Sequence, residues 1–259
     1  MGRITVLKSL VKDSLDTITH GTKKYHLWMA FLTAMMLAGM YCYSIQLEEG
    51  LIVTGMNDRV SWGLYISNFT FLVGVAAAAV MLVMPTYVLK DVDFKQAVLI
   101  GEGIAVAALF MCLAFVIADM GGPSVLWHMI PGIGVFHFPN SMLTWDVLVL
   151  NGYLFINISI PFYILFRHYQ GKEALAKVYV PGAFLSVFWA VGIHMVTAFL
   201  YQGLQARPFW NNALLGPRFL ASAFAAGPAL IILVLAIIRA NTEFKIKDKT
   251  IKKVALVVT

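Results

Sequence analysis

Residues 96–119 read QAVLIGEGIAVAALFMCLAFVIAD. Between Gln96 and Asp119 this stretch holds one charged residue, Glu102, and its apolar residues are continuous rather than alternating. A helix needs about 20 such residues to cross a hydrocarbon core, whereas membrane β-strands are shorter and alternate. The stretch therefore predicts a transmembrane α-helix. It decides the fold class, because lipid requires every backbone polar group to be paired within the protein.

Five further stretches have the same apolar character, namely residues 25–47, 61–89, 141–167, 178–204 and 217–240. We therefore expect an all-α, polytopic bundle with six full spans. After Lys252 and Lys253 a new apolar run begins at residues 254–259 (VALVVT). We expect this run to be the start of a seventh span, which would make the chain shortened or split relative to its relatives.

The composition agrees with a membrane protein. Of the 259 residues, 60% are apolar and only 12% are charged, and the mean hydropathy is +0.81. Soluble domains are about 25% charged, so these values exclude a soluble enzyme, a disordered tail and a nucleic-acid-binding domain, despite the net charge of +6. Cys42 and Cys112 match no disulfide, metal or haem-attachment spacing and are expected to pack in the bundle.

The lysines and arginines predict the orientation. Of the 19 cationic residues, only Arg59, Arg207 and Arg218 fall in one set of connections, and the remaining sixteen fall in the other set. Because cytoplasmic loops are enriched in Lys and Arg, the N-terminus is expected in the cytoplasm and the protein in the cytoplasmic (inner) membrane. Residues 1–24 then form a cytoplasmic amphipathic segment and residues 241–253 a basic cytoplasmic loop.

The connection at residues 120–140 has an unusual composition for an outer loop. It is rich in Gly and Pro, contains many large apolar residues and has no Lys or Arg. We expect it to fold back onto the bundle as a cap, which would bring Trp127, His128 and His137 over the outer ends of the spans.

Polar residues within the spans are functional candidates, because burying them in lipid is unfavourable. At 1.5 Å per residue, Asn68 is about 10 Å and His194 about 14 Å from the outer ends of their spans, and Glu102 is about 9 Å from the inner end. The outer half also holds Tyr65, Asp119, Asp146 and Asn151, and Asn157 lies further in. For the asparagines, interhelical hydrogen bonding is an equally good interpretation, and His194 can be an ordinary interface histidine.

Five segments resemble one family of membrane subunits. They are residues 62–69 (WGLYISNF, followed by Gly74), 119–128 (DMGGPSVLWH, followed by 141–145, SMLTW), 194–199 (HMVTAF), 207–210 (RPFW) and 217–222 (PRFLAS). Together they resemble NrfD-type polysulfide reductase membrane subunits, and the last three resemble the larger DsrP-like and HmcC-like branch. One departure is Gly122, because the family usually has an arginine before this proline. No role of that arginine is transferred to this chain.

The resemblance implies a subunit that binds menaquinone near the outer, periplasmic face and holds no haem or metal. It implies a periplasmic ferredoxin-like iron–sulfur partner, often with a multihaem cytochrome c and further membrane or catalytic subunits, and no nucleic acid. We expect three groups of site residues. Asp119, His128, Asp146 and His194 would be catalytic, Trp62, Tyr65, Asn68 and Trp127 would bind the quinone, and Glu102, Asn151 and Asn157 would form a proton path.

Two other functions remain open from the sequence. A haem-bearing cytochrome b subunit would need paired histidines at the same depth on facing helices, and only His194 lies well inside a span. A small-molecule transporter would use broken helices, which Pro85, Pro161, Pro181 and Pro228 could supply.

Overall fold

The structure is a computed structural model that describes residues 3–88, 90, 91, 93, 94, 97–244 and 246–258. In these residues the fold is helical, and the single β-bridge joins Asn57 to Val60. The expected span ends at residues 89 and 96, the loop cations Lys95 and Lys245, and the last residue, Thr259, lie outside the described residues. The elements in chain order are α1 (Arg3–Thr19), α2 (Lys23–Glu49), η1 (Leu51–Thr54), α3 (Leu64–Ala78), α4 (Val80–Val83), the π-helical turn η2 (Met84–Val88), α5 (Val98–Asp119), η3 (Pro123–Met129), α6 (Met142–Tyr169), α7 (Ala176–Gln202), α8 (Leu215–Asn241) and α9 (Asp248–Val258).

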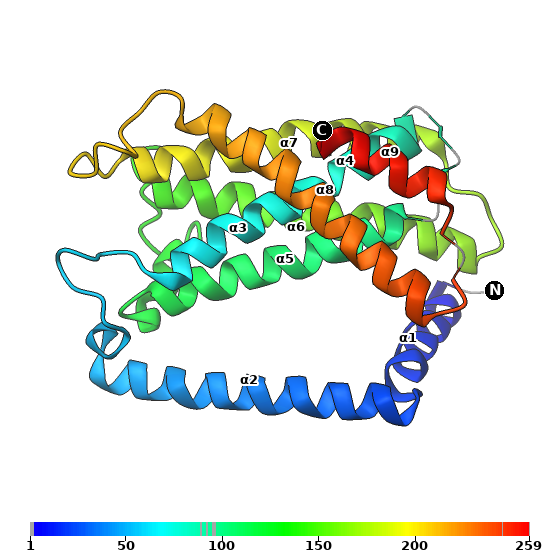
Figure 1. Cartoon of the computed structure of the whole chain (residues 1–259), viewed down its shortest axis with the longest axis horizontal. Coiled ribbons are helices and arrows are strands. Elements are labelled where there is room, and N and C mark those ends of the chain that lie inside the picture. Colours follow the sequence, from blue (N-terminus) through cyan, green and yellow to red (C-terminus); the bar gives the residue numbers. More distant parts are fainter. Residues whose placement is uncertain (1–2, 89, 92, 95–96, 245, 259) are drawn as a thin grey trace.

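Six of these segments are long and apolar enough to cross a membrane. They are α2, the run from α3 through η2 (Leu64–Val88), α5, α6, α7 and α8. The prediction of an all-helical chain with six spans is therefore confirmed. Following the charge pattern, we call the end with the loops 50–63, 120–141 and 203–214 the outer end, and the opposite end the inner end. α9 runs beside α8 near the inner end (Figure 1), and the further span expected at residues 254–259 stays a prediction.

α3 lies at the centre of the bundle and packs against α5, α7 and α8. Its residues from Val73 to Ala78 are all buried, and they are small enough to let other helices approach closely. Gly227 of α8 lies directly against Ala78 and Gly74, so that an added Cβ there would be 2.2 Å from the Ala78 Cβ. Small residues that allow close backbone approach are typical of membrane helix interfaces.

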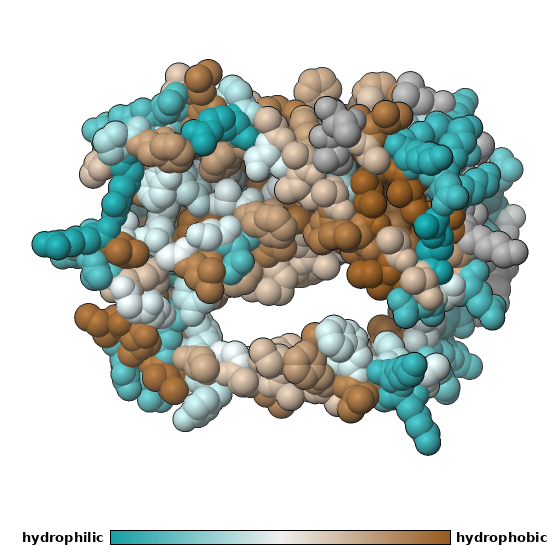
Figure 2. Space-filling view, viewed as in Figure 1, coloured by the Kyte–Doolittle hydropathy of each residue, from teal (hydrophilic) through white to brown (hydrophobic). Residues whose placement is uncertain are grey.

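α2 stands apart from the other spans. Figure 1 shows it alongside the bundle, and Figure 2 shows an open passage between it and the rest of the molecule. Its only buried residue is Gln46, near the outer end. The Gln46 amide donates to the Ala118 carbonyl at 2.6 Å, and the Tyr65 hydroxyl donates to Gln46 Oε1 at 2.7 Å. These two bonds attach the outer end of α2 to α5 and α3.

At the inner end, α1 crosses the end of α2 rather than continuing it (Figure 1). The Tyr169 hydroxyl at the end of α6 donates to Asp13 of α1 at 3.0 Å. The large apolar residues Leu7, Val11 and Leu15 remain exposed along one side of α1, as expected for a helix that lies on a membrane surface.

α9 is held at the inner end by charged groups. Lys249 and Lys253 lie 2.9 Å and 3.0 Å from the Asp93 carboxylate, and the Thr250 hydroxyl donates to the Asp93 carbonyl at 2.6 Å. The hydrogen bond from Lys249, followed by that from Lys253, lowers the pKa of Asp93 to about 2. Asp91 also pairs with Lys253, which lowers the pKa of Asp91 and raises that of Lys253.

Candidate functional site

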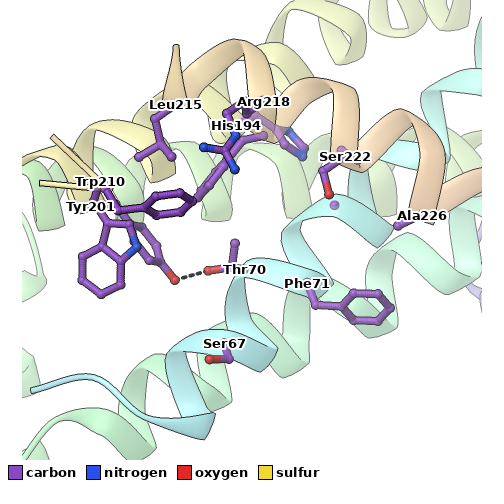
Figure 3. A pocket seen from close by; sticks show the side chains of 14 residues that line it. Ser67, Thr70, Phe71, His194, Tyr201, Trp210, Leu215, Arg218, Ser222 and Ala226 are labelled. Atoms are coloured by element: carbon purple, nitrogen blue, oxygen red, sulfur yellow. Dashed lines mark hydrogen bonds between the residues drawn. The ribbon is translucent and has the colours of Figure 1, made fainter. Parts of the chain in front are cut away.

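A cavity of about 490 Å³ lies between α3, α7 and α8 in the outer half of the bundle. Figure 3 shows its polar side chains, which come from all three helices. They are Ser67 and Thr70 of α3, His194 and Tyr201 of α7, and Arg218 and Ser222 of α8, and the loop residue Trp210 adds an indole. The cavity therefore combines apolar walls with a few hydrogen-bonding groups, which is the usual character of small-molecule sites.

His194 supplies the most informative group of this cavity. Its side chain is 2% exposed, and its Nδ1 lies 2.8 Å from the Ala190 carbonyl oxygen. A carbonyl only accepts, so Nδ1 must carry a hydrogen, and in the neutral ring this leaves Nε2 with a free lone pair. Nε2 is buried and has no hydrogen-bond partner. Because buried polar atoms normally have partners, this atom points to a ligand that supplies one.

Aromatic rings close the outer end of the cavity. The Tyr201 ring lies 5.0 Å from both Trp62 and Trp210 and 5.4 Å from Phe219, measured between ring centroids. The Tyr201 hydroxyl is hydrogen-bonded to Thr70, as the dashed line in Figure 3 marks. We call Trp62, Tyr201 and Trp210 the aromatic roof. Trp62, one of the expected quinone-binding residues, does not line the cavity but packs against two residues that do, Tyr201 and Trp210.

α7 presents a polar face at regular helical spacing. His194, Thr197 and Tyr201 follow one another at intervals of three and four residues, so their side chains share one side of the helix. Thr197 lies 3.1 Å from the Asp146 carboxylate of α6 and 2.7 Å from the Ile193 carbonyl. Asp146 is 1% exposed. Asp146 of α6 therefore lies against the same part of α7 that carries His194. His194 lines the cavity and Asp146 does not.

A second set of buried polar groups lies toward the inner end. Glu102 is 2% exposed and accepts a hydrogen bond from the Tyr87 hydroxyl at 3.1 Å. Asn157 is buried, and its amide donates to the Tyr153 carbonyl at 2.9 Å, while the Tyr153 side chain is completely buried. Asn151 differs from these residues, because it is exposed on α6 and donates to the Val147 carbonyl of its own helix. The structure does not bring Asn151 to Glu102 and Asn157.

The other expected site residues lie away from the cavity. Tyr65 is directed to Gln46 of α2 and lies 6.2 Å from the Phe115 ring. Asn68 is half-buried on α3, the helix that also carries Tyr65. Asp119 is the last residue of α5, and its Oδ1 is buried without a hydrogen-bond partner. Of these three residues Tyr65 contacts α2, and none of the three lines the cavity.

The outer loop also lies away from the cavity lining. Trp127 and His128 of η3 contact each other, with ring centroids 3.8 Å apart. Trp127 remains 48% exposed, and His137 and the apolar residues Ile133 and Val135 are exposed as well. The structure therefore does not bring this loop to His194.

Six polar or indole-bearing cavity residues were not among the expected site residues: Ser67, Thr70, Tyr201, Trp210, Arg218 and Ser222. Four of them, Ser67, Trp210, Arg218 and Ser222, belong to segments that carry the family resemblance, so a signal for them was present in the sequence. Thr70 and Tyr201 lie outside those segments, and only the packing of α3 against α7 brings them together.

The family is decided by a model that matches residues 52–259 and is described as polysulphide reductase, NrfD. The chain belongs to this NrfD family. It is 26% identical, over 258 residues, to the menaquinone reductase integral membrane subunit of Nitratidesulfovibrio vulgaris, covering 88% of this chain and 57% of that protein. It is 25% identical, over 234 residues, to the Hdr-like menaquinol oxidoreductase integral membrane subunit of Archaeoglobus fulgidus, covering 90% of this chain and 56% of that protein.

A third relative belongs to a different reductase. The NrfD-family chain is 24% identical, over 238 residues, to a selenate reductase subunit of Mesobacillus selenatarsenatis, covering 80% of this chain and 55% of that protein. The chain thus spans a little over half the length of the curated relatives it matches. Membership of the family, together with the six apolar helices, establishes a multi-pass membrane protein.

Metal and haem sites require particular sets of ligands. The described residues contain no group of three or more His, Cys, Asp or Glu side chains that could hold a metal ion. His194 lies in the middle of a span, whereas His26 and His168 lie in the first and last turns of α2 and α6 and the other three histidines lie outside the spans. A cytochrome b haem requires axial histidines paired at one depth, and among the described residues no second histidine lies at the depth of His194.

Proposed function

We propose that this chain is the menaquinone-binding membrane subunit of a respiratory redox complex, and that the cavity between α3, α7 and α8 holds the quinone ring. The observation that carries the proposal is the unpartnered Nε2 of His194 at an apolar cavity. A neutral imidazole with a free Nε2 accepts a hydrogen bond from a quinol hydroxyl, and the protonated ring donates to a quinone carbonyl. The names of the two menaquinone- and menaquinol-dependent relatives support the same ligand class.

The cavity also fits the shape and polarity of such a ligand. A quinone ring is flat and apolar with two polar oxygens, and the walls combine Phe71, Leu215 and Phe219 with the polar side chains already described. The aromatic roof covers the outer end, and aromatic rings stack favourably on other ring systems. We expect the isoprenoid tail to leave between α3 and α8, beside Phe71 and Ser222, which are exposed on the surface.

Proton transfer is the second part of the proposal. Interconversion of quinone and quinol moves protons as well as electrons, so each ring oxygen needs a proton carrier close by. Asp146 is buried and is linked through Thr197 to α7, three residues after His194. Toward the inner end, Tyr153, Asn157, Glu102 and Tyr87 extend the polar groups, and we propose them as the inner part of a proton path.

Electrons are proposed to pass to partner subunits. The partners in this proposal are a periplasmic ferredoxin-like iron–sulfur subunit and, with it, a multihaem cytochrome or other catalytic subunits. We propose that the cavity lies near the periplasmic side of the cytoplasmic membrane and the N-terminus in the cytoplasm, and the distribution of the cationic residues supports this orientation. Because the chain spans little more than half of its relatives, the reaction of a whole complex belongs to the same proposal.

The test is the affinity of the purified complex for a fluorescent hydroxyquinoline N-oxide, a quinol analogue. His194→Leu removes the only partner proposed for the ligand hydroxyl, and leaving such a group unpaired costs about 1–3 kcal/mol. We expect the Kd to rise at least about fivefold, which corresponds to about 1 kcal/mol. His26→Leu makes the same change at the inner end and is expected to leave the Kd unchanged.

A second substitution separates loss of binding from loss of folding. His194→Gln keeps a hydrogen-bonding group of similar length and should bind the analogue more tightly than His194→Leu. An unchanged Kd in His194→Leu that elutes as an intact complex would contradict the assignment of the cavity.

A further inference from the structure

Two outer loops bring arginines together that are far apart in the sequence. Arg59 follows η1, and Arg207 lies in the connection from α7 to α8. The Arg207 guanidinium donates a hydrogen bond to the Arg59 carbonyl, and both residues line a hollow of about 480 Å³ together with Asp58 and Ser61. We call Arg59 and Arg207 the outer arginine patch.

The charges of this patch are not neutralised within the described residues. Both arginines are exposed. The ion pairs of the described residues join Arg239 and three lysines to Asp91, Asp93 and Asp248, which all lie at the inner end. Two cations at one place with a single acidic neighbour, Asp58, attract an anionic surface, and the attraction is strongest where charges lie within a few ångströms.

The position of the patch is informative, because the outer end has very few cations. Only three of the 19 lysines and arginines of the chain fall in the outer connections or at their edges, and all three lie around the proposed quinone cavity. Arg218 lines the cavity and stacks over Phe209 at 4.7 Å. Arg59 and Arg207 lie three residues before Trp62 and Trp210, respectively, whose ring centroids are 5.8 Å apart in the aromatic roof.

The loops place the patch on the aqueous side of the roof. Figure 1 shows that the connections before α3 and between α7 and α8 project beyond the ends of the spanning helices. α3 begins only at Leu64 and α7 ends at Gln202, so both arginines lie outside the spans. This position favours a protein surface over lipid headgroups as the anionic partner.

We infer that the outer arginine patch is the electrostatic docking surface for an acidic face of the soluble electron-transfer subunit. The inference rests on the proposed function, since it takes the subunit that exchanges electrons with the quinone as the partner. Docking at this place would hold the redox centre of the partner over Trp62 and Trp210, which close the cavity. Charges at the rim of an interface mainly set the association rate and its salt dependence.

The test uses the complex purified through a tag on this chain. The iron–sulfur subunit that remains bound is quantified by immunodetection and by its iron content while the NaCl concentration is raised. In Arg59→Glu/Arg207→Glu the subunit should dissociate at a several-fold lower NaCl concentration than in the native complex. Lys172→Glu, an exposed residue of the loop between α6 and α7, makes the same kind of change at the inner end and should leave the dissociation midpoint unchanged.

Conservative and lipid controls complete the experiment. Arg59→Lys/Arg207→Lys keeps the charge and should retain most of the native midpoint. Equal midpoints in the native and Glu variants would overturn the inference. It would also be overturned if the loss appeared only in nanodiscs with anionic lipid, because the patch would then bind lipid headgroups. Retention of the analogue affinity in the Glu variant distinguishes this failure from a failure of the proposed quinone site.

Discussion

Gly227→Ala is the perturbation whose effect can be worked out most directly from the structure. A Cβ at Gly227 would lie 2.2 Å from the Ala78 Cβ and 3.0 Å from the Gly74 carbonyl oxygen. Carbon atoms in contact normally lie about 3.5–4.0 Å apart, so α3 and α8 would have to separate by about 1.5 Å. Overpacking of this kind costs about 1–3 kcal/mol, and the better helix propensity of Ala returns up to about 1 kcal/mol.

When the full 1 kcal/mol is returned, the expected net loss of unfolding free energy is up to about 2 kcal/mol. The cavity should also change, because Gly74 lies at this contact and lines the cavity, as does Ala226, which directly precedes Gly227. We therefore expect Gly227→Ala to unfold at a lower mole fraction of SDS in mixed micelles and to bind the quinol analogue about fivefold more weakly, which is about 1 kcal/mol.

Gly103→Ala is the matched control, because nothing lies within 4 Å of a Cβ added at Gly103 on α5. This variant should be as stable as the native chain or slightly more so, and its affinity should not change. If Gly227→Ala behaved like Gly103→Ala in both assays, the close packing of α3 against α8 and its role in shaping the cavity would be refuted.

Three further predictions follow from the inner end and the loops. Glu102→Gln should leave the Kd for the quinol analogue within about twofold and should slow proton-coupled quinol turnover in proteoliposomes, because Glu102 lies in the proposed proton path and not in the cavity. Turnover equal to that of the native complex would remove Glu102 from the proposed path. The pKa of Asp93 is lower in the folded protein (about 2) than its ordinary value of 3.8, so its stabilisation of α9 is complete above about pH 4 and is lost as the pH falls toward 2. Hydrogen exchange at Thr250, corrected for intrinsic rates, should accelerate over that pH range, and a rate that stays flat would argue against the ion pairs. A membrane-impermeant maleimide should label Arg59→Cys from the periplasmic side and Lys172→Cys from the cytoplasmic side only, and the opposite result would reverse the proposed orientation.

The six spans could be predicted because each is a continuous apolar run, and this signal needs no knowledge of the neighbouring helices. Depth along a helix could be predicted in the same way, since each residue adds 1.5 Å. The rotation of each helix about its axis could not be predicted from the sequence. Asn151 and Asn157 belong to the same span, yet Asn151 is exposed and Asn157 is buried. In uniformly apolar helices the sequence pattern does not distinguish the lipid-facing side from the buried side.

The candidate site shows the same division. The depth of His194 makes it a candidate, and it lines the cavity. The family resemblance makes Trp62 a candidate, and Trp62 packs against Tyr201, which lines the cavity. Thr70 and Tyr201 are 131 residues apart in sequence and meet only because α3 packs against α7. The separation of α2 from the bundle also has no sequence signal, because its composition resembles that of the packed spans. For this reason the sequence does not show that Tyr65, one of the expected quinone-binding residues, is instead hydrogen-bonded to Gln46 of α2.

The central claim is that the cavity between α3, α7 and α8 binds the quinone ring. Photolabelling of the purified complex with a photoreactive menaquinone analogue, followed by mass spectrometry of the peptides, tests it most directly. The account predicts labels on peptides that contain Thr70, His194 or Ser222, and their loss when unlabelled menaquinone is in excess. Displaceable labels confined to α2 or to the loop at residues 120–140 would contradict it.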